Sequence, residues 1–187
     1  MEAFLISTLA VAVSEIGDKT QFVALILAAR FQRPAPIILG ILVATLANHT
    51  LAALAGDWVR AALPAEYLRW ALGVSFLAVA VWALLPDRMD FEARDRGRYG
   101  VFMTAAVAFF LAEMGDKTQI ATAVLAAKYG DLVSVVGGTT LGMMMADVPA
   151  VLLGGAAAKK IPLKAVRYAA AAIFALLGVS ALAGRFV

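Results

Sequence analysis

The chain carries the septet EIGDKTQ at Glu15–Gln21, and a second copy that differs at one position, EMGDKTQ, at Glu113–Gln119. Each septet brings two carboxylates and a lysine into the middle of a long apolar segment. Ionised groups are costly in hydrocarbon, so charges at such positions indicate a functional site. Two copies about half a chain apart predict that both halves of the chain build one site between them.

The composition is that of a membrane protein. Hydrophobic residues make up 63% of the chain and the mean hydropathy is +0.89, whereas a soluble domain has roughly 45–50% apolar residues. A helical span needs about 20 apolar residues, and alternating strand patterns are absent. We therefore predict an all-α membrane protein, embedded in the lipid bilayer, with six transmembrane helices. The predicted spans are Phe4–Ala29, Ile37–Gly56, Leu68–Leu85, Val101–Ala127, Leu132–Ala158 and Ala165–Leu182.

The repeat extends beyond the septets. Nine of the fifteen positions from Glu15 to Ala29 match their partners 98 residues later, and Gly40 matches Gly138. The repeating unit is therefore three helices, and an odd number of spans places the second unit upside down relative to the first. This is the inverted-repeat arrangement of many secondary transporters. The predicted units are 1–86 and 100–187, joined by a connector at 87–99.

The basic residues predict the orientation and exclude a nucleic-acid partner, since they lie at helix ends rather than in a patch. Cytoplasmic loops of membrane proteins carry an excess of Lys and Arg. The loops after the first, third and fifth spans hold ten such residues and the opposite face holds four, which predicts a cytoplasmic connector and both termini outside. The ten are Arg30, Arg33, Arg88, Arg94, Arg96, Arg98, Lys159, Lys160, Lys164 and Arg167, and the four are Arg60, Arg69, Lys128 and Arg185.

The acidic residues of the septets predict a cation site. If the inverted repeats pack around a pseudo-two-fold axis, Glu15, Asp18, Glu113 and Asp116 converge near the bilayer centre; on a continuous helix, Glu15 and Asp18 would share one face. Repulsion and desolvation both disfavour four ionised carboxylates at one poorly hydrated place. The site must therefore bind protons, a cation, or each in turn, which is a physical basis for antiport.

The donor types favour a hard divalent cation. Carboxylate, amide and hydroxyl oxygens suit calcium, magnesium or manganese. The chain has no cysteine and one histidine, which disfavours zinc and copper and removes thiolate sites altogether. Further oxygens can come from Thr20, Thr118, Gln21 and Gln119.

The remaining candidate residues of the apolar segments each have two possible roles. Gly17 and Gly115 permit either close helix packing or local unwinding. Lys19 and Lys117 are candidate counter-ions of the empty site, with snorkelling as the alternative. In the second and fifth spans the secondary candidates are Asp147, its repeat partner His49, and Asn48, as gating or supporting groups or as interhelical hydrogen-bond partners.

The twin septets resemble the Glu-x-Gly-Asp-(Lys/Arg)-(Ser/Thr) motifs of the Gdt/MneA-type family of membrane cation exchangers. The resemblance covers the whole chain and implies exchange of manganese or calcium against protons without a cofactor. It implies that Glu15, Asp18, Glu113 and Asp116 are ligands, with Thr20 and Thr118 as lesser candidates. The chain has no long N-terminal targeting extension, which resembles the bacterial members, so we expect Mn²⁺ export across a bacterial inner membrane.

Other functions fit less well. An intramembrane aspartyl protease needs Gly-x-Gly-Asp, but Glu15 and Glu113 occupy the first position of that pattern, and no HExxH zinc motif is present. An enzyme is therefore not expected. The alternatives that stay open are a Ca²⁺/H⁺ antiporter and a divalent-cation channel, which would differ in whether a proton moves. A homo-oligomer is compatible with the sequence.

Overall fold

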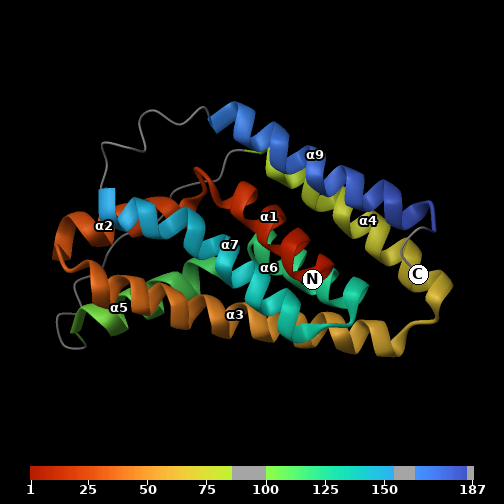
Figure 1. Cartoon of the computed structure of the whole chain (residues 1–187), viewed down its shortest axis with the longest axis horizontal. Helices are drawn as coiled ribbons and strands as arrows, with labels where there is room; N and C mark the ends of the chain where they lie inside the picture. Colours follow the sequence, from red (N-terminus) through yellow and green to blue (C-terminus); the bar gives the residue numbers. More distant parts are fainter. Residues whose placement is uncertain (86–99, 154–162, 185–187) are drawn as a thin grey trace.

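The protein is described by a computed structural model that covers residues 1–85, 100–153 and 163–184. Within these ranges every regular element is a helix and none is a strand, which confirms the all-α prediction for this part of the chain (Figure 1). The helices are α1 (Glu2–Glu15), α2 (Lys19–Phe31), α3 (Pro34–Ala62), α4 (Ala65–Leu84), α5 (Gly100–Glu113), α6 (Lys117–Tyr129), α7 (Leu132–Leu153) and α9 (Leu163–Leu182).

Four of these helices are long and apolar enough to cross a membrane: α3, α4, α7 and Lys164–Leu182 of α9. The two predicted spans that contain the septets are instead divided into half-helices, α1 with α2 and α5 with α6, of 13 or 14 residues each. The expectation that Glu15 and Asp18 share one helix face is therefore wrong, because the helix ends at Glu15 and the next begins at Lys19.

Helix packing follows the sequence repeat in the centre of the molecule. If α1, α2, α3 and α4 correspond to α5, α6, α7 and α9, then the contact of α1 with α7 corresponds to that of α5 with α3, and both are extensive. The contacts of α1 with α6 and of α2 with α5 form a second equivalent pair. Small residues permit the closest approach: a Cβ built on Gly56 of α3 would lie 1.9 Å from the carbonyl oxygen of Ala123 in α6.

The outer helices α4 and α9 depart from this symmetry. They run side by side along one edge of the molecule (Figure 1) and pack against α6 and α1 respectively. The repeat-equivalent contacts, α4 with α5 and α9 with α2, are weak or missing among the described residues. The buried apolar residues accordingly form two main clusters, one that includes α4 and α9 and one that is built from α2, α3, α5 and α7.

Several sequence predictions concern residues that the structure does not describe. These are the connector at 87–99, the end of the fifth predicted span, and the basic residues at 88–98, 159, 160 and 185.

Candidate cation site

The helix break in each septet is produced by its glycine. Gly17 and Gly115 have φ angles of 79° and 76°, a left-handed conformation that glycine adopts without steric cost. Nothing lies within 4 Å of a Cβ built on Gly115, so at this position the glycine serves the turn and not close packing. Of the two readings of these glycines, local unwinding is the one that the backbone supports.

The glutamine that ends each septet closes the same turn. Its side-chain oxygen accepts a hydrogen bond from the glycine amide, at 2.9 Å for Gln21 and Gly17 and at 2.7 Å for Gln119 and Gly115. The amide nitrogen of Gln21 donates to the carbonyl oxygen of Ala146 in α7. The glutamines therefore hold the backbone break and tie it to the neighbouring helix; a direct role of their oxygens as cation ligands stays a prediction.

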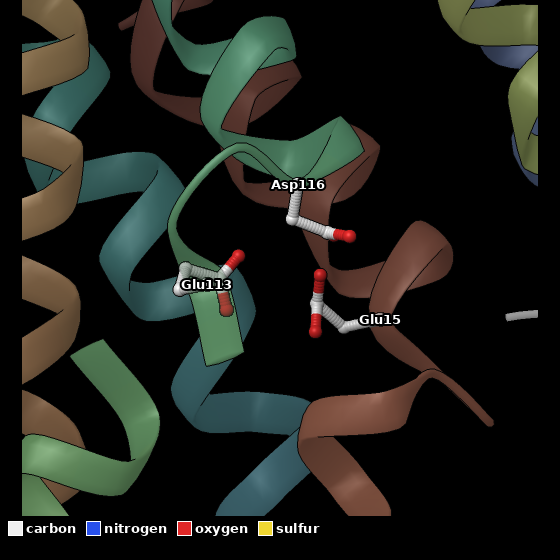
Figure 2. A group of neighbouring side chains, drawn as sticks. All are labelled: Glu15, Glu113 and Asp116. Atoms are coloured by element: carbon white, nitrogen blue, oxygen red, sulfur yellow. The ribbon is translucent and has the colours of Figure 1, made fainter. Parts of the chain in front are cut away.

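Three carboxylates meet where the half-helices end. Glu15 and Glu113 are the last residues of α1 and α5, and Asp116 directly precedes α6. One oxygen of each lies within 4.8 Å of the others, and all three residues are buried. Figure 2 shows the three side chains pointing toward one another across the space between the two repeats. This three-carboxylate cluster offers a cation oxygen ligands from both halves of the chain.

The threonines of the septets orient the two glutamates. The Thr20 hydroxyl donates to Oε2 of Glu15 at 2.6 Å, and the Thr118 hydroxyl donates to Oε1 of Glu113. Among the described residues, the other oxygen of each glutamate has no hydrogen-bond partner. A buried carboxylate oxygen without a donor is costly, so each glutamate keeps one oxygen available for a cation or a proton.

The lysines form ion pairs that cross from one repeat to the other. Lys19 lies 2.7 Å from Oδ1 of Asp116, and the Lys117 ammonium contacts Oδ1 of Asp18. Neither lysine is paired with the aspartate of its own septet in these contacts. The fourth predicted carboxylate, Asp18, is buried but does not belong to the three-carboxylate cluster. We call Lys19–Asp116 and Lys117–Asp18 the cross-repeat ion pairs.

The secondary candidates lie on α3 and α7. Asn48 is fully buried; its side-chain nitrogen donates to the carbonyl oxygen of Phe110 near the end of α5, and its oxygen lies 3.4 Å from the amide of Gln119. His49 and Asp147 are also fully buried, and their side-chain polar atoms have no hydrogen-bond partner among the described residues.

Two features beside the site could not be expected from the sequence. One is the Ala146 carbonyl, a backbone group whose only sequence signal is that Ala146 is the repeat partner of Asn48. The other is a cavity with room for about one water molecule, beside the Lys117–Asp18 pair. Its polar lining includes Ser14 of α1 and Arg167 of α9.

Comparison with known proteins agrees with this chemistry. The model of the family described as "Divalent cation/proton antiporter GDT1" matches residues 3–91 and 101–186. A Vibrio cholerae protein named "Putative manganese exporter" is 49% identical over 181 residues, which are 96% of this chain and 90% of that protein. A GDT1-like protein of Synechocystis is 32% identical over 201 residues, or 96% of each chain. No solved structure matches.

These matches span nearly the whole chain and confirm the resemblance that the septets indicated. The family is one of transporters, as expected, and not of enzymes; the divalent cation is its substrate and not a cofactor. The chain therefore belongs to the GDT1 family of divalent cation/proton antiporters.

Proposed function

We propose that this protein exports Mn²⁺ from the cytoplasm in exchange for protons. The observation that carries the proposal is the three-carboxylate cluster, which is buried and is assembled from both repeats of a chain in an antiporter family. The relative named as a manganese exporter supports Mn²⁺ as the ion. Ca²⁺ is the second candidate, because it uses the same oxygen ligands.

The proposed ligands are the free oxygens of Glu15 and Glu113 together with Asp116. Two observations support this assignment: one oxygen of each of the three residues lies within 4.8 Å of the others, and one oxygen of each glutamate has no hydrogen-bond partner among the described residues. The hydroxyls of Thr20 and Thr118 are further candidates, whereas Asp18, the fourth acid expected from the sequence, is paired with Lys117 in this conformation. Mn²⁺ accepts such hard oxygen ligands.

The same carboxylates supply the proton coupling. Three acidic groups that share a buried site cannot all stay ionised without a cation, because repulsion and desolvation add up. A cation that binds must displace protons, and protons that return must displace the cation. We therefore propose that the two substrates alternate at one site, and that higher pH strengthens Mn²⁺ binding.

The half-helices are proposed to span the bilayer as two composite segments, α1 with α2 and α5 with α6. With α3, α4, α7 and α9 they make six crossings in two inverted repeats, and the helix breaks lie near the bilayer midplane. The equivalent packing of α1 on α7 and α5 on α3 supports this arrangement. The positive-inside rule favours outside termini in a bacterial inner membrane.

The one-sided packing of α4 and α9 supports alternating access. Their contacts with α1 and α6 lack strong equivalents on α2 and α5, so the two ends of the site differ in how they are covered. The water-sized cavity beside Lys117–Asp18 lies on the side that α4 and α9 cover, and its lining includes Ala83 of α4 and Arg167 of α9. If helices α4 and α9 moved from α6 and α1 to α5 and α2, the covered end of the site would become the open one and the open end would become covered.

The proposal is tested in proteoliposomes that contain a pH-sensitive dye and receive Mn²⁺, Ca²⁺ or Mg²⁺. We expect Mn²⁺ to drive proton movement, and we expect Glu15→Gln and Asp116→Asn to abolish it while the protein still inserts. Glu2→Gln is the matched control, because Glu2 lies at the start of α1, away from the site. Ion uptake without proton movement would indicate a channel and refute the exchange. Proton movement driven by Ca²⁺ but not by Mn²⁺ would identify Ca²⁺ as the substrate instead.

A further inference from the structure

The two cross-repeat ion pairs are equivalent in sequence but unequal in their surroundings. The side chains of Lys117 and Asp18 are 5% and 0% exposed, whereas those of Lys19 and Asp116 are 27% and 2% exposed. A symmetric pair of repeats has therefore placed one ammonium inside the protein and left the other at its edge. The same chemical contact can be broken more easily on one side than on the other.

The two aspartates differ as well. Asp116 belongs to the three-carboxylate cluster, and its Oδ1 already contacts the ammonium of Lys19 at 2.7 Å. A divalent cation at the cluster would need the Asp116 carboxylate and would repel that ammonium. The ion and Lys19 therefore compete for one ligand. Asp18 lies outside the cluster, so no such competition arises at Lys117 in this conformation.

The cost of moving each ammonium follows from its burial. Lysine has a flexible four-carbon stem, and a partly exposed ammonium can swing away while the stem stays packed. The Lys117 ammonium is buried, and separation from Asp18 would leave two charges desolvated, which is expensive. Lys19 can give up Asp116 at smaller cost, because its ammonium is partly exposed and a cation bound at the cluster would neutralise the buried Asp116 carboxylate in its place.

We propose that Lys19 is a tethered counter-cation that competes with the transported ion for Asp116, whereas Lys117 stays on Asp18 and clamps the two repeats together. This inference rests on the proposed binding of the ion at the three-carboxylate cluster. It makes Lys19 a residue that weakens binding and speeds release, because its ammonium is ready to replace the departing ion. Removal of Lys19 should tighten binding and slow turnover.

The test is Mn²⁺ binding to the purified full-length protein at one fixed pH, measured by calorimetry. We expect Lys19→Met to bind Mn²⁺ about fivefold more tightly, which is about 1 kcal/mol, the upper worth of a partly exposed ion pair. Lys19→Arg keeps the charge and should bind like the wild type. Lys128→Met is the matched control, because Lys128 lies at the far end of α6 and contacts Tyr129.

Transport measurements separate this role from a purely structural one. Lys19→Met should lower both KM and kcat for Mn²⁺, whereas a structural defect would lower the amount of active protein and leave KM unchanged. Lys117→Met should not bind Mn²⁺ more tightly than the wild type.

The possible results separate the two proposals. Wild-type protein that does not bind Mn²⁺ would refute the proposed function itself. Wild-type binding that Lys19→Met does not strengthen, or that Lys117→Met strengthens equally, would overturn the assignment of Lys19 alone. If Lys117→Met does not fold, the comparison of Lys19→Met with Lys19→Arg still decides.

Discussion

Removal of the Lys117 ammonium is the perturbation whose cost follows most directly from the structure. Lys117→Met leaves the fully buried Asp18 carboxylate without its ammonium partner, and loss of one member of a buried ion pair costs about 3–5 kcal/mol. Lys19→Met breaks the equivalent pair, in which the carboxylate of Asp116 is also buried but the ammonium is 27% exposed, so its cost lies between about 1 kcal/mol for an exposed pair and about 3–5 kcal/mol for a buried one. The two substitutions are the same Lys→Met change, and the two lysines differ chiefly in burial.

Thermal unfolding of the detergent-purified protein, followed by tryptophan fluorescence, is the assay. For a chain of this length each kcal/mol shifts the Tm by about 2–4 °C, so Lys117→Met should lower the Tm by roughly 6–20 °C. Lys19→Met should lower the Tm by less than Lys117→Met does, because the Lys19 ammonium is already partly solvated in the folded protein. The double variant Asp18→Asn/Lys117→Met removes both charges together and should recover most of the loss.

Two results would refute this reasoning. One is an equal fall in Tm for Lys117→Met and Lys19→Met, which would mean that burial does not govern the cost of the pairs. The other is a double variant that loses as much as its two single variants combined, since independent residues behave in that way.

Three further predictions concern the backbone and the outer helices. Gly56→Ala should lower the free energy of unfolding by about 1–3 kcal/mol, seen as a fall in Tm, because the new methyl group would overlap the Ala123 carbonyl. Gly115→Ala should reduce transport and cost about 1–2 kcal/mol, because its φ of 76° strains any side chain although space is free. A disulfide between Val13→Cys and Ala170→Cys should stop transport until it is reduced, because it would fix α9 to α1 where Val13 packs against the cluster that contains Ala170.

A specific result would contradict each of these three predictions. An unchanged Tm for Gly56→Ala would contradict the close approach of α3 and α6. Full transport by Gly115→Ala would show that the left-handed turn is dispensable. Undiminished transport by the oxidised disulfide variant, with both single-cysteine variants active as controls, would mean that α9 need not move from α1; the chain has no native cysteine to confuse the result.

The class of protein and the carboxylates that form the candidate site could be proposed from the sequence because they depend on local signals, and the structure brings Glu15, Glu113 and Asp116 together. Long apolar runs predict membrane-spanning helices, and charged residues within such runs indicate a functional site. The helix breaks at Gly17 and Gly115 were only one of two readings, since an isolated glycine in an apolar run is compatible with a continuous helix. What decides between them is the glutamine that closes the turn, four residues after each glycine.

The partners of the lysines could not be predicted for a different reason. Lys19 follows Glu15 at the spacing of one helical turn, which favours a pair within the septet. The helix break removes that geometry, and Lys19 meets Asp116 of the other repeat instead. Long-range pairing of this kind depends on how the repeats pack, and a single sequence carries no record of it.

The cross-repeat ion pairs also set a condition on biosynthesis. A ribosome delivers Asp18 and Lys19 to the membrane long before Lys117 and Asp116 have been made, so the first half of the chain enters the bilayer with charges whose partners do not yet exist. Unpaired charges are costly in hydrocarbon. The first septet is therefore expected to stay in a hydrated environment or at the insertion machinery until the second septet has been made. We therefore expect the first septet to complete its insertion only after the second septet has been synthesised, so that the two halves of the chain reach their final positions together.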